Sequence, residues 1–459
     1  MAPSVPAWLE ELCQRLVDND KNFRTVELTH PRIDDVFAKV FAKALDENTT
    51  VTTLVLSCFS IVDDGAYAIG SVLANNKKLQ KLQFRELRNS REVITFFSLL
   101  KENSSIEELS LRHSQICPVG AVHVANYFQS RGPDHAALQE IRFVDCQFIG
   151  NSLEILCEGL RKCRSLQRLY FVNTEIGSHG SVYVANVLQD GGCLRELYLG
   201  ENEIGDDGVA ALSGGVLRST SLRLLDLRAN AITSTGALSL QGIVGRSQFL
   251  QTLLLGSNEL GNLGVVALGR GLNQASCVLQ KLDLSDNGID HEGACSIASS
   301  LLVNKSLEEL NLSFNAIGDA GAGAFASGLQ RNLTLRCLTL RRNSITNAGA
   351  LMLAERLPTM NGLKELTLNK NLIDMNGCSA LLEALRLNVE LEYLSIQENF
   401  SEPVARQIIH WIRLNKAGRR IFRHPNVPCP VWPLVYGKVS AESDLLFHFL
   451  KEKPEVVSI

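Results

Sequence analysis

The segment GENEIGDDG, residues 200–208, is the first place in the chain where residue types and spacing could do chemistry. It holds four carboxylates within seven residues, Glu201, Glu203, Asp206 and Asp207, and glycines frame it. Loops rich in carboxylates hold hard cations such as Ca²⁺ when the oxygens converge. The same letters could also form a spacer in a repeating chain, with no chemistry of its own. The elements that position the carboxylates therefore decide between the two interpretations.

A nine-residue pattern, L-x-x-L-x-L-x-x-N, recurs along the chain and includes this segment. Seven steps separate its eight strong copies, and every step is 28 residues except one of 29. These copies start at Leu194, Leu222, Leu250, Leu279, Leu307, Leu335, Leu363 and Leu391. Weaker copies start at Phe23, Val51, Leu79, Ile106, Leu138 and Leu166, which makes fourteen repeats. Self-similarity at such a period indicates a stack of supersecondary units.

This pattern resembles the leucine-rich repeat family, and its 28-residue step is similar to the ribonuclease-inhibitor-like class. The resemblance covers residues 23–414 and implies an α/β fold, a solenoid (horseshoe) with a parallel concave β-sheet and convex helices. The residues agree with it, because Leu197 and Leu199 alternate around Tyr198 as in a strand, whereas Leu353 and Leu357 have helical spacing.

The ninth template position is asparagine in all eight strong copies, which predicts a ladder of buried amides that bond the turn backbone. The six weak copies depart from it. Cys146 and Thr174 can partly replace asparagine, whereas Phe59 and Leu87 cannot. We therefore expect less regular stacking in the N-terminal third. The longer step from Ile106 to Leu138 predicts a surface loop over residues 130–136.

Placed in this template, GENEIGDDG joins a strand to a helix. Asp206 falls in a column of residues that are, apart from one histidine, preferred helix N-caps, so we predict that it caps its helix. The column also contains Asp63, Ser178, Ser234, Asn262, His291, Asp319 and Asn347. The template spreads Glu201, Glu203 and Asp206 apart, so we predict no metal site there and no cofactor.

The ends of the repeat array need covers for their exposed cores. We predict an N-terminal capping helix within residues 1–22, the repeat domain over 23–414 and a C-terminal cap and tail over 415–459. The cap helix at residues 6–18 carries an apolar face of Trp8, Leu9, Leu12, Leu16 and Val17. The last helix, near residues 403–415, is expected to turn Ile408, Ile409, Trp411 and Ile412 inward.

Bulk composition favours no nucleic-acid or membrane partner. The net charge is −4, the pI is near 6.2, and no run of apolar residues is long enough to cross a membrane. The N-terminus does not read as a signal peptide, so we expect a cytoplasmic or nuclear protein. The glycosylation sequons, for example at Asn48, Asn304 and Asn332, then carry little meaning. The 12 cysteines show no CxxC pair, which favours reduced, buried thiols.

No catalytic constellation is present in the sequence. There is no G-x-S-x-G, H-E-x-x-H or Walker motif, and the nine histidines are scattered. A glycine-rich stretch at 318–328 follows the repeat's own glycine positions rather than a phosphate loop. A basic cluster, Lys416, Arg419, Arg420 and Arg423, could dock an acidic partner or lie on a solvated turn.

The strand residues that face solvent give the candidate partner-binding site. Counterparts in neighbouring repeats stack in rows, and two tyrosines lie among arginines, a composition typical of interface hot spots. The alternative is an alternating-charge ladder, Glu140, Arg168 and Glu196, beside tyrosines that merely pave the sheet. The candidate residues are Arg142, Arg168, Tyr170, Tyr198, Asp226, Arg228 and Leu254.

We therefore expect a non-enzymatic scaffold that binds a protein partner of unknown identity in its concave face. The alternative is a regulator of a small GTPase, because the sequence resembles the Ran GTPase-activating protein in repeat length. Its C-terminal tail, however, lacks the strongly acidic run of those proteins. The oligomeric state is not predicted.

Overall fold

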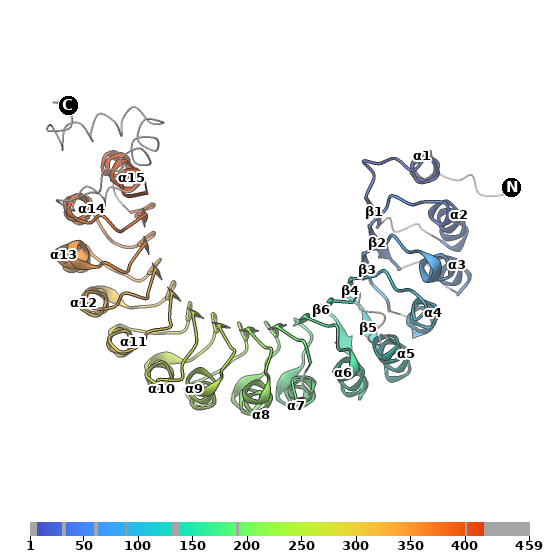
Figure 1. Cartoon of the computed structure of the whole chain (residues 1–459), viewed down its shortest axis with the longest axis horizontal. Coiled ribbons are helices and arrows are strands. Elements are labelled where there is room, and N and C mark those ends of the chain that lie inside the picture. Colours follow the sequence, from blue (N-terminus) through green and yellow to red (C-terminus); the bar gives the residue numbers. More distant parts are fainter. Residues whose placement is uncertain are drawn as a thin grey trace, which may run out of the picture. The chain divides into compact units, whose positions relative to one another are not determined.

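The structure is a computed structural model, and it describes residues 7–29, 34–58, 63–88, 90–130, 138–189, 192–399 and 402–416. The chain forms two compact units. The first comprises Met1–Ile232 with Ser247–Leu253, and the second comprises Thr233–Arg246 with Leu254–Ile459. In each unit the strands line one side and the helices line the other (Figure 1).

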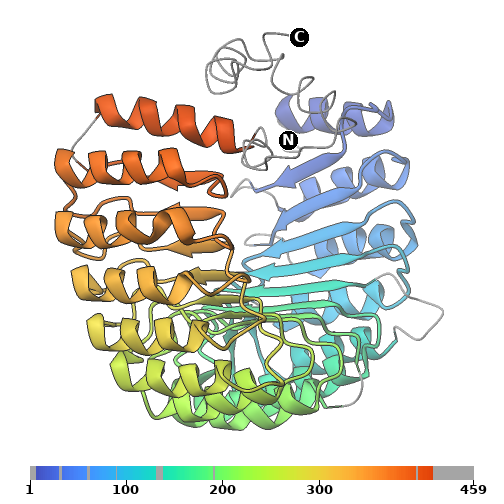
Figure 2. The ribbon, with the colours of Figure 1, turned by 60° about the vertical axis from the view of Figure 1, so that its left-hand side comes forward.

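The first unit repeats a strand followed by a helix, and its strands run parallel in the order β1-β2-β3-β4-β6-β8-β9-β10 (Figure 2). These strands are β1 Thr25–Leu28, β2 Thr53–Ser57, β3 Lys81–Arg85, β4 Glu108–Arg112, β6 Glu140–Val144, β8 Arg168–Val172, β9 Glu196–Tyr198 and β10 Leu224–Asp226. The helices are α1 Ala7–Val17, α2 Asp35–Asp46, α3 Asp63–Asn75, α4 Ser90–Leu100, α5 Pro118–Gln129, α6 Ser152–Lys162, α7 Gly177–Val187 and α8 Gly205–Arg218. A second parallel pair, β5 Gln115–Ile116 and β7 Gln147–Phe148, lies in the turns of two neighbouring repeats.

The second unit has the same plan, with parallel strands in the order β12-β13-β14-β15-β16. These are β12 Lys281–Asp283, β13 Glu309–Asn311, β14 Cys337–Thr339, β15 Glu365–Thr367 and β16 Tyr393–Ser395; β11, Thr252–Leu254, spans the boundary between the units along the chain. The helices are α9 Gly236–Arg246, α10 Gly261–Leu272, α11 His291–Leu301, α12 Gly318–Leu329, α13 Asn347–Arg356, α14 Met375–Leu387 and α15 Glu402–Lys416, with a 3₁₀ turn at Leu357–Thr359. In both units a strand begins each predicted repeat, which confirms the α/β repeat with a parallel sheet.

Each repeat buries its apolar residues between its strand and its helix. In the repeat from Leu194, Leu197 and Leu199 of the strand segment and Val209 and Leu212 of α8 are all fully buried. Gly208 permits this packing, because a Cβ there would lie 2.5 Å from the Ile204 side chain and 2.8 Å from Ser181 Oγ of the preceding repeat. One repeat alone cannot enclose such a core, so the repeats are stable only as a stack.

The asparagines at the ninth template position close the turns, as the sequence predicts. Asn202 is fully buried; its Nδ2 donates to Phe171 O at 2.7 Å and to Gly200 O at 2.9 Å, and its Oδ1 accepts from Thr174 N at 2.9 Å. In turn, Asn230 Oδ1 accepts from Asn202 N at 3.1 Å. Each asparagine thus satisfies backbone groups of the repeat before its own, which would otherwise be buried without partners.

The residue before each ladder position adopts a left-handed backbone. The φ angle is +59° at Glu201, +52° at Ala229 and +53° at Arg342, and it is positive at the same template position elsewhere in both units. Left-handed backbone is uncommon outside glycine, so the ladder hydrogen bonds must offset its cost. This turn sends Glu201 and Glu203 outward and Asn202 inward.

The early repeats are more regularly paired than the sequence predicts. The expectation of less regular stacking is wrong for the described strands, because β2, β3, β4, β6 and β8 pair in register over five residues, against three in β9 and the later strands. Ser114 and Cys146 replace the asparagine by bonding carbonyls, at Arg112 O (2.9 Å) and Leu111 O (3.3 Å) respectively. Leu87 is simply buried. Phe59 and the predicted loop from 131 onward lie outside the described residues.

The predicted helix-capping role of the Asp206 column is wrong. Asp206 lies inside the first turn of α8, which begins at Gly205. In the second unit, the column residue Asp319 accepts from Thr346 N at 2.7 Å and Gly349 N at 2.9 Å, both at the start of the following helix. Asn347 does the same for Asp374 N at 2.9 Å. These two side chains therefore join helix starts of successive repeats.

A second set of buried asparagines, which the nine-residue pattern did not predict, closes the turn from helix to strand. Asn332 Nδ2 donates to Leu301 O of the preceding repeat at 2.7 Å, and its Oδ1 accepts from Thr334 N at 2.9 Å. Asn48 and Asn304 make the same contacts. All three belong to glycosylation sequons, so the Ser or Thr of each sequon is explained here by the turn.

The terminal helices agree with the prediction in part. In α1, Leu9 and Leu16 are buried, whereas Trp8 and Val17 are exposed. In α15, Ile408 and Ile412 are buried and Ile409 is exposed. The tail beyond Lys416, with Arg419, Arg420 and Arg423, lies outside the described residues, and the predicted domain limits stay a prediction.

We predict that Asn371→Ala lowers the free energy of unfolding by at least about 2 kcal/mol, because the buried Asn343 N and Leu340 O lose their side-chain partner. The wild-type amide accepts from Asn343 N at 2.8 Å and donates to Leu340 O at 2.8 Å and Leu368 O at 3.0 Å. Urea denaturation followed by circular dichroism measures the change. The control Asn376→Ala removes an exposed amide five residues away, and equal stabilities of the two variants would contradict the role of the ladder.

Candidate protein-binding site

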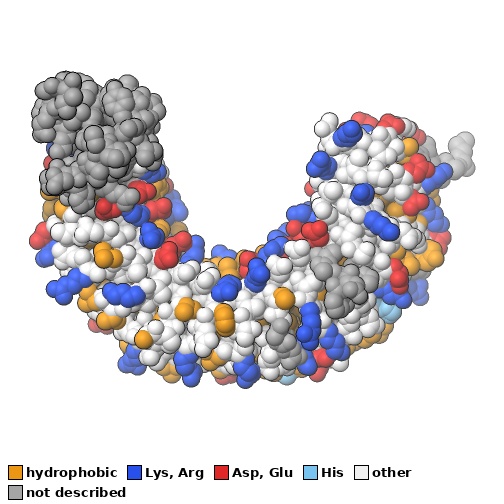
Figure 3. All heavy atoms as spheres, viewed as in Figure 1, with side chains coloured by type: hydrophobic (Ala, Val, Ile, Leu, Met, Phe, Trp, Pro, Cys, Tyr) orange, Lys and Arg blue, Asp and Glu red, His pale blue; other side chains and the backbone are white. Residues whose placement is uncertain are grey.

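Most of the predicted site residues lie on the sheet face of the first unit, the side of the sheet away from the helices. The register pairs Arg142 with Tyr170, Tyr170 with Tyr198 and Tyr198 with Asp226 in one row across β6, β8, β9 and β10. Arg168 stands in the neighbouring row, between Glu140 and Glu196. Figure 3 shows Lys and Arg side chains with Asp and Glu among them along this side of the unit.

The centre of the site is a stack of three side chains. The rings of Tyr170 and Tyr198 lie parallel, with an interplanar angle of 2° and centroids 4.1 Å apart. The guanidinium carbon of Arg142 lies 4.3 Å from the Tyr170 ring centroid. Offset aromatic stacking and a cation over a ring are each favourable by about 0.5–1.5 kcal/mol. All three side chains are half-buried, so they are ordered without being hidden.

A buried carboxylate holds the arginines in place. Glu140 is only 3% exposed, and it accepts hydrogen bonds from Arg142 Nε and from Arg168 Nε, the second at 2.5 Å. Burial alone would disfavour its charge, but the two arginines outweigh that effect and hold the pKa of Glu140 below its ordinary value. Glu140 and Arg168, two members of the alternative charge ladder, thus form an ion pair, and Glu140 also orients Arg142 beside Tyr170.

The other flank of the stack is fixed by two further carboxylates. Tyr198 donates its hydroxyl proton to Glu196 Oε2 at 2.8 Å, and burial together with this bond raises the pKa of Tyr198. Asp226, 3% exposed, accepts from Arg228 at 2.6 Å and 2.9 Å. The Arg228 side chain remains 52% exposed above it. The phenol is thus a neutral donor and the guanidinium a cation open to solvent.

Leu254 and the acidic loop at residues 200–208 are not part of this cluster. Leu254 belongs to the second unit, where it ends β11 and is half-buried, so it is not one of the residues that the first unit brings together. The acidic loop places Glu201 and Glu203 outward at left-handed positions, on either side of the buried Asn202. Over the described ranges, no group of three or more His, Cys, Asp or Glu side chains could hold a metal ion.

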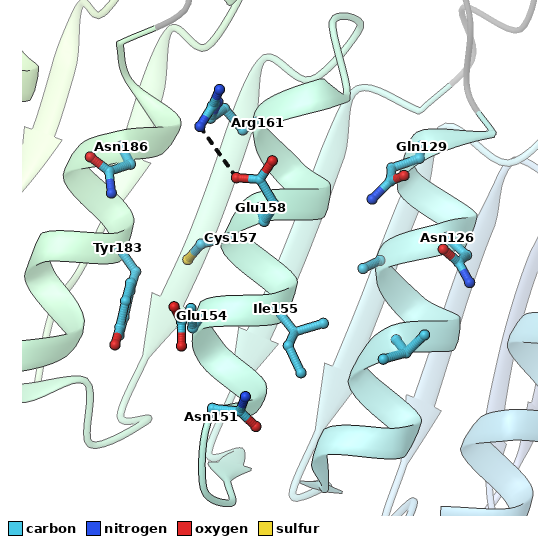
Figure 4. A pocket seen from close by; sticks show the side chains of 12 residues that line it. Asn126, Gln129, Asn151, Glu154, Ile155, Cys157, Glu158, Arg161, Tyr183 and Asn186 are labelled. Atoms are coloured by element: carbon cyan, nitrogen blue, oxygen red, sulfur yellow. Dashed lines mark hydrogen bonds and ion pairs between the residues drawn. The ribbon is translucent and has the colours of Figure 1, made fainter.

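The helix side of the first unit carries a groove that the sequence analysis did not single out. Its volume is about 520 Å³, and it runs across α5, α6 and α7. Figure 4 shows Glu154, Cys157 and Tyr183 around the space between α6 and α7. Glu158 pairs with Arg161 at 3.3 Å, and burial raises the pKa of the Cys157 thiol, which keeps it protonated. The lining mixes polar side chains with apolar ones such as Val122 and Ile155, and the Cys157 thiol is not an activated nucleophile.

Comparison with known proteins agrees with the fold. The family model described as "Leucine Rich repeat" matches six stretches, 193–213, 218–240, 246–269, 275–298, 303–326 and 331–354. The chain is a leucine-rich repeat protein, and its 28-residue units are of the ribonuclease-inhibitor-like class. No curated protein matches this chain.

Two solved structures show weak similarity. The crystal structure of the yeast Rad7 and Elc1 complex is 16% identical over 81% of this chain and 91% of that chain, with a TM-score of 0.45. The leiomodin-1 actin-binding site 2 is 18% identical over 41% of this chain and 92% of that chain, with a TM-score of 0.29. Likenesses of this size carry no argument about what the chain binds.

We predict that Glu140→Gln destabilises the protein most at neutral pH. A carboxylate whose pKa is lowered by folding stabilises the native state above its unfolded pKa, near 4.5, and loses this effect as the pH falls through the folded pKa. The difference in unfolding free energy between wild type and variant should therefore shrink on acidification below about pH 4.5. Urea unfolding over a pH series measures it, with the exposed Glu203→Gln as control. A difference that grows in acid would contradict the described ion pairs.

Proposed function

We propose that the protein is a non-enzymatic scaffold that binds a protein partner through the sheet face of the first unit. The observation that carries this proposal is the Arg142–Tyr170–Tyr198 stack, which is half-buried and held by Glu140 and Glu196. Tyrosine and arginine contribute disproportionately to the free energy of protein–protein binding. A repeat protein of this class also offers a long, continuous surface for such a contact.

The side chains of the stack are already held in one conformation, which favours binding. A free arginine loses conformational entropy when a partner immobilises it, at a cost of about 0.5–1.5 kcal/mol per side chain. Arg142 and Arg168 are already immobilised on Glu140, and Arg228 on Asp226, so most of this loss precedes association. The outer nitrogens of Arg142 and Arg168 can meet a partner's carbonyls, and the half-buried tyrosine rings can meet its apolar side chains.

The absence of enzymatic activity rests on the repeat class and on the chemistry of the described side chains. The thiols of Cys146 and Cys157 have raised pKa values because they are buried, and the Tyr183 hydroxyl of the helix-side groove meets His179 Nε2 at 3.1 Å in an exposed contact within one helix. No helix within the described ranges is long and apolar enough to cross a membrane. Regulation of a small GTPase stays a prediction of the sequence that no described residue favours.

We predict that Tyr170→Ala combined with Tyr198→Ala lowers the captured amount of the principal partners at least about tenfold, because the lost rings belong to the contact. The double variant should still fold. Affinity capture of tagged protein from its source cells, followed by quantitative mass spectrometry, measures the loss. A matched control, Tyr67→Ala combined with Tyr183→Ala, removes two tyrosines of the helix side. If the sheet-face variant folds and keeps every partner, the proposed site is wrong.

A further inference from the structure

Two arginines stand side by side on the sheet face at the ends of β3 and β4. Arg85 and Arg112 are register partners on neighbouring parallel strands, where backbones lie about 4.8 Å apart. Like charges directly opposite each other in a sheet are destabilising unless something of opposite charge lies between them. The chain itself supplies no such group among its described residues, as the neighbouring carboxylates show.

The nearest acidic side chains are engaged elsewhere or turned away. Glu108 pairs with Lys81 at 2.8 Å, and Glu140 pairs with the arginines of β6 and β8. Glu86 follows Arg85 at a left-handed φ of +59°, and no ion pair joins it to either arginine. With the Gln83 amide in its favoured orientation, its oxygen accepts from Arg85 Nε at 2.7 Å, which is a neutral contact.

Two polar atoms of β4 are buried without any hydrogen bond. They are Ser110 Oγ and Arg112 Nε, and both belong to the sheet face beside Arg85. Burying a donor without a partner is unfavourable, so such an atom in a native protein calls for an explanation. Both atoms are donors, and they lie in the same strand, two residues apart. An incoming acceptor is the group that would satisfy them.

A recess adjoins this pair at the turn that follows β4. It has a volume of about 360 Å³ and is lined by Arg88, His113, Ser114, Gln115, Asp145 and Gln147. His113 is the residue after Arg112. The one acid in the recess, Asp145, accepts from Asn173 Nδ2 at 2.8 Å and lies 3.5 Å from His113 Nδ1. The recess thus contains an acid of its own, so the proposed anion site is confined to the arginine pair on the sheet face.

We infer that Arg85, Arg112 and Ser110 form a carboxylate-binding site for an acidic segment of the protein partner. One carboxylate lies between the two guanidinium groups, and the Arg112 side chain turns outward to donate through Nε. This inference rests on the proposed function for the identity of the partner's class, because the site shares the sheet face with the Tyr170–Tyr198 stack.

The same template position in the second unit does not carry a pair of arginines. Arg341 also has a buried Nε without a hydrogen bond, but its guanidinium carbon lies 5.4 Å from the Phe314 ring centroid. The residue 28 positions further on is Asn369, not a second arginine. The like-charged pair is thus a feature of β3 and β4 rather than of the repeat.

The test uses a fluorescein-labelled octaglutamate peptide and the full chain, with binding measured by fluorescence anisotropy at low salt. We expect Arg85→Gln combined with Arg112→Gln to raise the dissociation constant at least about tenfold, since charge-assisted hydrogen bonds are lost. The control Arg218→Gln combined with Arg270→Gln changes net charge equally on the helix side and should leave binding within about twofold. Added salt should weaken wild-type binding. Thermal melts confirm that both variants fold.

Three results would overturn the inference. They are no peptide binding by the wild type, an equal loss in the control variant, or a preference of more than about tenfold for a phosphorylated peptide of equal charge, which would make the site a phosphate site. Capture from cells separates the proposed function from the acidic-segment inference. If the tyrosine variant loses the partners and the Arg85/Arg112 variant keeps them, the sheet face still binds protein and only the acidic-segment inference fails. If the tyrosine variant keeps them while octaglutamate binding depends on the arginine pair, the proposed function alone fails.

Discussion

The structure depends on one constraint: the chain must leave each strand through a buried turn whose backbone groups still need hydrogen bonds. Asn202 shows the solution, with its amide bonded to Phe171 O, Gly200 O and Thr174 N. Because the side chain of one repeat completes the turn of the repeat before it, neighbouring repeats are locked together at a 28-residue offset. The left-handed residue before each ladder position is tolerated only in this setting.

The fixed 28-residue offset brings polar and aromatic side chains together on the sheet face. It places Arg142, Tyr170, Tyr198 and Asp226 at the same height on successive strands, so residues 28 apart in sequence become neighbours. The parallel register pairs these strands residue by residue, so the side chains on successive strands face one another at a fixed spacing. The stack of two rings and a guanidinium is a consequence of this register, as is the pair formed by Arg85 and Arg112.

The period and the alternation of leucines were enough to predict the strands, the helices and the inward asparagines, because these depend on position within one repeat. Contacts between repeats were harder to foresee. Asp319 resembles a helix cap in sequence, yet it bonds the start of the next helix, since the two helix starts lie side by side only after stacking. Asn332 resembles a glycosylation acceptor until its burial is seen.

The candidate site, like the fold, was predictable in its positions along the repeat but not in its contacts between side chains. The rows of facing residues followed from the template, so Tyr170 and Tyr198 could be paired in advance. The role of Glu140 could not, because its burial and its two arginine partners depend on side-chain directions that sequence spacing does not fix. The groove across α5, α6 and α7 left no sequence signal, since its lining residues recur at ordinary helical positions.

A protein partner should contact the sheet face of the first unit. Site-specific photocrosslinking tests it directly, with a benzophenone amino acid placed at Leu224, beside Asp226 in β10, or at Val182, exposed on α7. Illumination in cells should join the partner to the protein labelled at residue 224 and not to that labelled at residue 182. Crosslinking from residue 182 alone would contradict the account and move the contact to the helix side.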